Sequence, residues 1–142
     1  MASIVEIREM SEEQIEELLE DAREEMFNLR FQRAIGQLED YRRIRQVRRD
    51  IARYQEVLHK RESAIDNAAG HPEIAAALAN QVWSAAAYFD YEESAWLVKF
   101  TDDGGDTLAA AKVDLNKKKL RGRRDRNQKK PVQHVLSVEI AG

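Results

Sequence analysis

The strongest constraint on the fold is a pair of apolar stripes with helical spacing on either side of Gly36. The stripe before this glycine comprises Ile15, Leu18, Leu19, Ala22, Met26, Leu29 and Ala34. The stripe after it comprises Ile44, Val47, Ile51, Tyr54 and Leu58. Steps of three and four residues place each stripe on one face of a helix, and that face has to be buried. The pattern therefore predicts a long antiparallel hairpin of two helices.

Local signals give the limits of both predicted helices. Ser11 followed by Gln14 is the pattern of a capping box, so the first helix is expected over residues 12–35. Gly36 can adopt the left-handed conformation that ends many helices. Asp40 is a suitable N-cap for the second helix. The connection is only about four residues long, so the chain has to reverse its direction there.

The helical periodicity ends in a break at residues 67–72, which contains a glycine and a proline. We therefore expect two domains, a hairpin over residues 1–66 and a C-terminal extension over residues 67–142. A third helix is predicted from Pro72 to about residue 88, since proline is favoured in the first helical turn. The alternative for residues 82–91, which are rich in aromatics at their end, is a strand.

The rest of the extension alternates apolar and polar residues, which is typical of strands. Strands are expected over residues 94–101 and 107–115, joined by a turn at residues 102–106. A third strand follows Pro131, with one face formed by Val132, His134, Leu136, Val138 and Ile140. The predicted fold is thus mainly α, a two-helix hairpin followed by a small α+β extension with a short antiparallel sheet.

Charge is strongly segregated along the chain, although the formal net charge is only −3. Residues 6–25 contain ten acids and two arginines, whereas residues 30–53 contain eight arginines and three acids. Residues 117–130 contain nine lysines or arginines and one acid. Screening limits the influence of each cluster to about 8–10 Å, so local charge matters more than the mean. The distribution favours binding to a polyanion.

The arginines around the glycine are the first candidate RNA-binding residues. They are Arg30, Arg33, Arg42, Arg43, Arg45, Arg48, Arg49 and Arg53. A solvated charged face is the competing interpretation, but arginine binds phosphate with two hydrogen bonds and few acids are spaced to neutralise these side chains. Phe27 and Phe31 could stack on bases, although packing in the protein core is the favoured interpretation for them.

The basic run within residues 117–130 supplies the second set of candidates, which are Lys117, Lys118, Lys119, Arg121, Arg123, Arg124, Arg126, Lys129 and Lys130. With few apolar residues, this run cannot form a core. It is interpreted as a phosphate-binding loop between the second and third strands, and the competing interpretation is a disordered soluble loop.

Other chemistry finds little support in the sequence. Asp102, Asp103 and Asp106 lack the spacing of a calcium-binding loop and suit a turn instead. The three histidines are far apart in the sequence and the chain has no cysteine, so we expect no metal, no cofactor, no small-molecule substrate and no enzymatic activity. No apolar run is long enough to cross a membrane, and the N-terminal residues lack a targeting pattern, so a cytoplasmic location is expected.

One stretch of the sequence identifies a family. Residues 25–32 (EMFNLRFQ), Ala34, residues 36–39 (GQLE) and the segments RIR, VRR and IAR within residues 43–53 resemble the twenty-ninth protein of the bacterial large ribosomal subunit. The resemblance covers about residues 4–65. It implies a ribosome-bound helical hairpin on large-subunit rRNA near the exit of the polypeptide tunnel. It also implies RNA contacts by Arg30, Gln32, Gly36, Gln37, Arg43, Arg45, Arg48, Arg49 and Arg53.

The resemblance further implies a neighbour, the twenty-third protein of the large subunit, with trigger factor or the signal recognition particle close by. A different function remains open for the same helices. The seam of Ile44, Val47, Ile51, Tyr54 and Leu58 could bind helices of other proteins, as a coiled-coil adaptor that never contacts RNA. The extension over residues 67–142 resembles no family, and its partner could be RNA or a neighbouring protein.

Overall fold

The computed structural model describes residues 2–116 and 134–141. The chain forms two compact units, Met1–His59 and Lys60–Gly142. Helix α3 (Tyr41–Ala69) contributes residues to both units, so the division falls before the boundary at residues 66 and 67 that the sequence suggests. The reason is that Ala64 and Ala68 are fully buried in the apolar core of the second unit.

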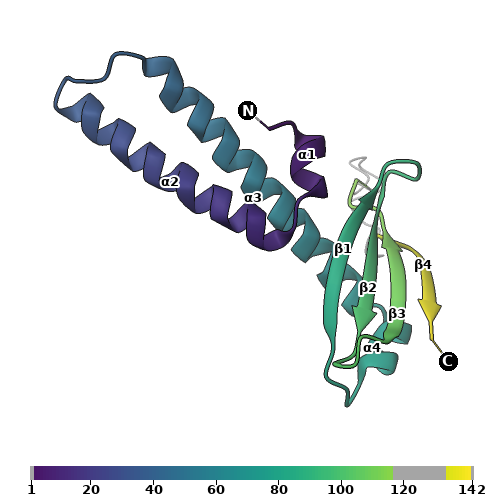
Figure 1. Cartoon of the computed structure of the whole chain (residues 1–142). Helices are drawn as coiled ribbons and strands as arrows, with labels where there is room; N and C mark the ends of the chain where they lie inside the picture. Colours follow the sequence, from purple (N-terminus) through teal and green to yellow (C-terminus); the bar gives the residue numbers. More distant parts are fainter. Residues whose placement is uncertain (1, 117–133, 142) are drawn as a thin grey trace, which may run out of the picture. The chain divides into compact units, whose positions relative to one another are not determined.

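The first unit is the predicted hairpin, formed by α2 (Glu12–Ala34) and the first part of α3, which run side by side in Figure 1. Two clusters of buried side chains join these helices. Near the start of α2 the cluster contains Ile15, Leu19, Tyr54 and Val57, and near the end of α2 it contains Met26, Leu29 and Val47. Early residues of α2 thus pack near the middle of α3 and late residues of α2 pack near its start, which confirms the antiparallel arrangement.

A short helix that the sequence interpretation did not anticipate precedes the hairpin. Helix α1 (Ile4–Glu9) begins with a capping box, in which Ser3 and Glu6 each accept a hydrogen bond from the other's backbone N–H. Its residue Ile7 is fully buried in the cluster that contains Ile15. The α1 segment therefore covers the open end of the seam between α2 and α3, where a two-helix hairpin would otherwise expose apolar surface.

The caps of α2 are those that the sequence predicts. Ser11 and Gln14 form the capping box at its start. At its end Gly36 has a φ of +74°, and its N–H donates to the carbonyl of Arg33. The N–H of Gln37 donates to the carbonyl of Gln32 over 2.9 Å. These two bonds form a Schellman motif, which requires the left-handed conformation at the glycine.

Replacing Gly36 with alanine is expected to lower the free energy of unfolding by about 1 kcal/mol. A Cβ at this position would meet no atom within 4 Å, so the cost comes from the backbone conformation alone. Gly36→Asn is the matched control, because asparagine tolerates the left-handed region better than alanine does. Urea denaturation followed by circular dichroism measures both variants. Equal losses for alanine and asparagine would contradict this explanation of the glycine.

The second unit contains a four-stranded antiparallel sheet in the order β1-β2-β3-β4. The strands are β1 (Ser84–Asp90), β2 (Ala95–Thr101), β3 (Thr107–Val113) and β4 (Val135–Ile140). Helix α4 (Pro72–Leu78), which begins at the predicted proline, packs on one face of the sheet with the end of α3. The predicted α+β extension with a short antiparallel sheet is thereby confirmed (Figure 1).

One predicted element of the extension is wrong. The helix expected as far as residue 88 ends at Leu78, and the strand alternative is confirmed by β1. Alanine favours helices locally, but Ala85 and Ala87 pair with Phe100 and Val98 of β2 and pack in the core. Burial against large neighbours across the sheet overrides the small preference of alanine for a helix.

The core of the second unit combines large side chains with several alanines. As predicted, Trp96, Val98 and Phe100 share one buried face of β2. The predicted face of the last strand is partly wrong. A bulge between Lys112 and Val113 changes the register, so that Val135 packs on the core while the side chain of Leu136 is exposed. Residue 132 lies outside the described part of the chain.

Candidate nucleic-acid interface

The first turns of α3 form a dense basic surface. Between residues 42 and 53 this helix contains six arginines and one acid, Asp50. Its N-terminus is set by Asp40, whose carboxylate accepts a hydrogen bond from the amide of Arg42 over 2.9 Å. Helical rotation places Arg45, Arg49 and Arg53 in one row on the side away from the buried Val47. Arg45 and Arg49 of this row are exposed on the surface of the hairpin, whereas Arg53 is half-buried.

Six of the eight predicted arginines around the bend are exposed and have no carboxylate partner among the described residues. Within residues 2–116 and 134–141, no ion pair involves Arg30, Arg33, Arg42, Arg45, Arg48 or Arg49. These six guanidinium groups retain their capacity for two parallel hydrogen bonds to a phosphate. Arg33 also lies over the ring of Tyr41, 6.0 Å from its centroid, across the connection between the helices.

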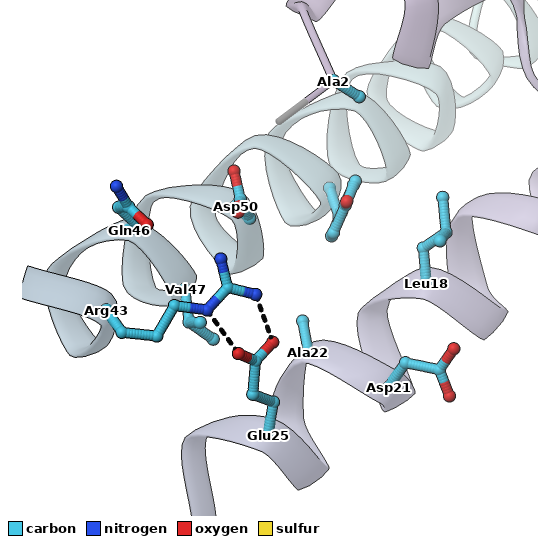
Figure 2. Close-up of a pocket in the computed structure, with 10 residues that line it drawn as sticks. Ala2, Leu18, Asp21, Ala22, Glu25, Arg43, Gln46, Val47 and Asp50 are labelled. Carbon is cyan, nitrogen blue, oxygen red and sulfur yellow. Dashed lines mark hydrogen bonds and ion pairs between the residues drawn. The ribbon is translucent and has the colours of Figure 1, made fainter. Parts of the chain in front are cut away.

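Two of the predicted arginines are engaged within the hairpin. Arg53 is half-buried and donates to Asp50 one helical turn earlier, over 3.2 Å. Arg43 donates two hydrogen bonds to Glu25 of α2, from Nε over 2.5 Å and from Nη2 over 2.9 Å. Figure 2 shows this pair facing each other between the two helices. The sequence interpretation missed it, because the two residues are eighteen positions apart.

The Glu25–Arg43 pair changes the pKa of the arginine. Hydrogen bonding to Glu25 and the attraction of its charge raise the pKa of Arg43 above its usual value. An arginine is already fully protonated near neutral pH, so this shift does not alter its charge there. The pair instead fixes the guanidinium beside the seam, which removes much of its capacity to bind an external phosphate. Arg43 is consequently the weakest candidate among the predicted RNA-binding arginines of α3.

A cavity of about 450 Å³ lies beside this pair, between α2 and α3. Its polar lining includes Asp21, Glu25 and Asp50 but only one cation, Arg43 (Figure 2). Tyr54 also lines it, and partial burial raises the pKa of this phenol. An excess of carboxylates repels phosphate. The cavity is therefore unsuited to RNA, and the basic surface outside it remains the candidate interface.

The bend itself presents polar groups to solvent. Gln32, Gly36 and Gln37, which the family resemblance assigns to RNA contact, are all exposed. The backbone N–H groups of Gly36 and Gln37 are used in the helix cap, so their availability to RNA is limited. The side-chain amides of both glutamines remain exposed, and each can donate to and accept from a nucleotide.

Phe27 and Phe31 are not core residues, contrary to the favoured interpretation of the sequence. Their side chains are 71% and 59% exposed. The physical reason is helical rotation, because Phe27 is two residues before the buried Leu29 and Phe31 is five residues after the buried Met26. Those separations turn Phe27 by about 160° from Leu29 and Phe31 by about 140° from Met26, although Phe27 is only about 100° from Met26. The structure thus leaves two phenyl rings on the outer side of α2.

The second predicted basic set falls within residues 117–133, outside the described part of the chain.

The aspartates between β2 and β3 lie in a turn, as the sequence predicts. Asp102 accepts hydrogen bonds from the amides of Gly104 and Asp106, both over 2.9 Å. Among the described residues, no group of three or more histidines, cysteines or acids is placed to hold a metal ion. No helix in the described ranges is long and apolar enough to cross a membrane.

Comparisons with known proteins match the helical part of the chain. The profile of the family described as ribosomal L29 protein matches residues 5–61. The chain is 48% identical over 68 residues to large ribosomal subunit protein uL29 of Mycobacterium ulcerans, covering 48% of this chain and 85% of that protein. It is 54% identical over 59 residues to uL29 of Geobacillus stearothermophilus, covering 42% of this chain and 89% of that protein. At this identity over most of each relative's length, the chain belongs to the ribosomal L29 protein family.

Proposed function

We propose that this protein is a structural constituent of the large ribosomal subunit that binds large-subunit rRNA through the arginines of α3 and the bend. The observation that carries this proposal is the set of six exposed arginines without a described carboxylate partner. Phosphates are the ligands that such groups bind most strongly. Membership of the family supports the ribosomal context, since this family is a structural and non-enzymatic ribosomal component.

The location within the subunit is proposed from the family resemblance. The relatives are named as proteins of the large ribosomal subunit. We place this chain near the exit of the polypeptide tunnel, beside the twenty-third protein of the large subunit, in cytoplasmic ribosomes. Trigger factor and the signal recognition particle would then act close to it. Direct contact with the twenty-third protein is testable by chemical crosslinking of assembled subunits.

The coiled-coil adaptor function is disfavoured by the packing of the hairpin. An adaptor would need the seam of α3 free to receive a helix from another protein. Val47 is 1% exposed and Tyr54 is 9% exposed, because α2 already covers them. Opening the hairpin to expose this seam would remove its apolar core.

Co-sedimentation with ribosomal subunits tests the proposed function. The full chain is expected in the large-subunit fraction of a sucrose gradient, and RNase treatment is expected to release it. Retention of the chain on protein complexes after complete RNA digestion would support the adaptor function instead. Absence of the chain from the large-subunit fraction would overturn the ribosomal proposal.

We extend the proposal to the organisation of the chain, with an rRNA-binding domain at residues 1–66 and an additional domain at residues 67–142. The family profile ends at residue 61, so the sheet unit is an addition to the family hairpin. The basic run within residues 117–130 would give this domain its own contact with rRNA phosphates. A chain without this run, sedimented beside the full chain at several salt concentrations, isolates that contribution.

Replacing Glu25 with glutamine is expected to strengthen RNA binding while slightly weakening the fold. The change removes the charge that holds Arg43 and releases its guanidinium for a phosphate. Both partners are more than a third exposed, so screening limits the loss of folding free energy to about 0.2–1 kcal/mol. The affinity for rRNA should rise about two- to tenfold, with a steeper dependence on salt. Glu20→Gln, which removes an acid paired with Arg23 on the same helix, is the control.

A further inference from the structure

The outer side of α2 carries an aromatic ridge, formed by Phe27, Phe31 and Ile35. These residues are four apart, so their side chains follow one another along a single face of the helix. They are 71%, 59% and 50% exposed. Helical rotation places the two rings far from the side that packs on α3. Folding of the hairpin therefore does not account for three neighbouring apolar side chains in water.

The surroundings of the aromatic ridge change along the helix. Before it, the sequence is acidic, and Glu20 and Arg23 pair with each other there. Beside the rings stands Arg30, which is exposed and has no carboxylate three or four residues away in either direction. After the ridge, the bend and the first turns of α3 add the other exposed arginines of the candidate interface. The rings are thus continuous with the basic surface.

The positive charge of Arg30 beside the rings favours RNA over a protein as the partner of the aromatic ridge. An apolar groove on another protein would have to bury this guanidinium beside the rings, and an unpaired buried charge is costly. RNA offers phosphates to the arginine and flat nucleobases to the phenyl rings at the same time. Every unpaired base has a face that stacks on an aromatic ring, whereas bases inside a duplex already stack on their neighbours.

We propose that Phe27 and Phe31 form a stacking site for unpaired nucleobases of RNA, with Arg30 binding the adjacent phosphate. The proposal rests on the proposed function, because it assigns to the arginine surface a class of RNA, namely a loop, a bulge or a single-stranded segment. Direct stacking makes the preference independent of base identity. The arginines of α3 contact the backbone, and the aromatic ridge distinguishes unpaired from paired RNA.

Binding measurements on the full chain test this assignment. The probes are a fluorescein-labelled single-stranded RNA of about 12 nucleotides, within the size range of known stacking sites, and the same RNA annealed to its complement. The double variant Phe27→Ala/Phe31→Ala should bind the single strand at least about tenfold more weakly, as expected for the loss of stacked bases. Its affinity for the duplex should change by less than about twofold, and its salt dependence should stay unchanged because no phosphate contact is lost.

Two further variants control for other effects. Phe27→Leu/Phe31→Leu keeps apolar side chains but removes the rings, so it should lose nearly as much affinity for the single strand as the alanine variant. Tyr88→Ala removes an aromatic side chain of similar exposure, 58%, from β1 and should bind as the unmodified chain does. Full affinity of the leucine variant, or an equal loss for single strand and duplex, would overturn the stacking site.

The same binding measurements distinguish failure of the stacking site from failure of the proposed function. If replacement of Arg45, Arg49 and Arg53 with glutamate abolishes binding while the alanine and leucine variants of the two phenylalanines bind normally, the stacking site alone is overturned. Failure of the unmodified chain to bind either RNA overturns both. Both phenyl rings are exposed and alanine favours helices, so the folded structure should survive, which circular dichroism verifies.

Discussion

Replacing Arg45, Arg49 and Arg53 together with glutamate is expected to abolish incorporation of the protein into large ribosomal subunits. The variant converts one row of α3 from three positive to three negative charges. Each lost charge-assisted hydrogen bond costs about 1.5–3 kcal/mol, so affinity for rRNA should fall by at least about 1,000-fold. The slope of log affinity against log salt should also fall by about 0.7–0.9 for each lost phosphate contact. Sucrose gradients and filter binding measure these two effects.

The matched control replaces the same three arginines with lysine. This variant keeps the charge, so its salt slope should resemble that of the unmodified chain. Lysine cannot form the two parallel hydrogen bonds of a guanidinium, so a moderate loss of affinity remains expected. Arg53 contributes least to this comparison, because it already donates to Asp50. Normal sedimentation of the glutamate variant with large subunits would refute the role of this row.

Phe100→Ala is expected to have the largest effect on stability, with a loss of about 3–5 kcal/mol in the free energy of unfolding of the sheet unit. Phe100 is fully buried in the core to which β2, β3, α4 and the end of α3 contribute. Its ring also lies 5.3 Å from that of Trp83, in an edge-to-face arrangement. Truncation leaves a cavity that neighbouring alanines are too small to fill.

The chain offers a convenient measurement of this loss. Both tryptophans, Trp83 and Trp96, belong to the sheet unit, so urea denaturation followed by tryptophan fluorescence reports on that unit. Far-ultraviolet circular dichroism reports mainly on the long helices. Phe31→Ala removes the same side chain from an exposed site and should change stability by less than about 0.5 kcal/mol. An equal loss in both variants would contradict the burial of Phe100 as the cause.

The hairpin was predictable because local and long-range preferences agree there. Capping residues, the glycine stop and the apolar spacing all indicate the same two helices, and the structure confirms them. The helical spacing of the apolar stripe also places Phe27 and Phe31 outside the buried face, so their exposure was predictable from the sequence, although core packing was the favoured interpretation. The capping-box pattern at Ser3 and Glu6 similarly indicated α1, although a helix of six residues gives little periodicity to support it.

The sheet unit was harder to predict because its elements depend on partners far away in the sequence. Nothing within residues 84–90 forces a strand, and their alanines favour a helix. Pairing with β2 and contact with Trp96 stabilise the strand relative to a helix, and both require the complete sheet. The Glu25–Arg43 pair has the same origin, because only the folded hairpin brings these residues together. The exposed arginines needed no such information, since charge clustering alone pointed to them.

The position of Ala64 in α3 has a practical consequence for protein engineering. A fragment cut where the helical periodicity breaks, at residues 66 and 67, would give the sheet unit Ala68 but deprive it of Ala64. Its core would lack part of the helical wall, and the exposed apolar surface would favour aggregation. A fragment intended for transplantation onto another scaffold should therefore begin at Lys60, with the last turns of α3 included.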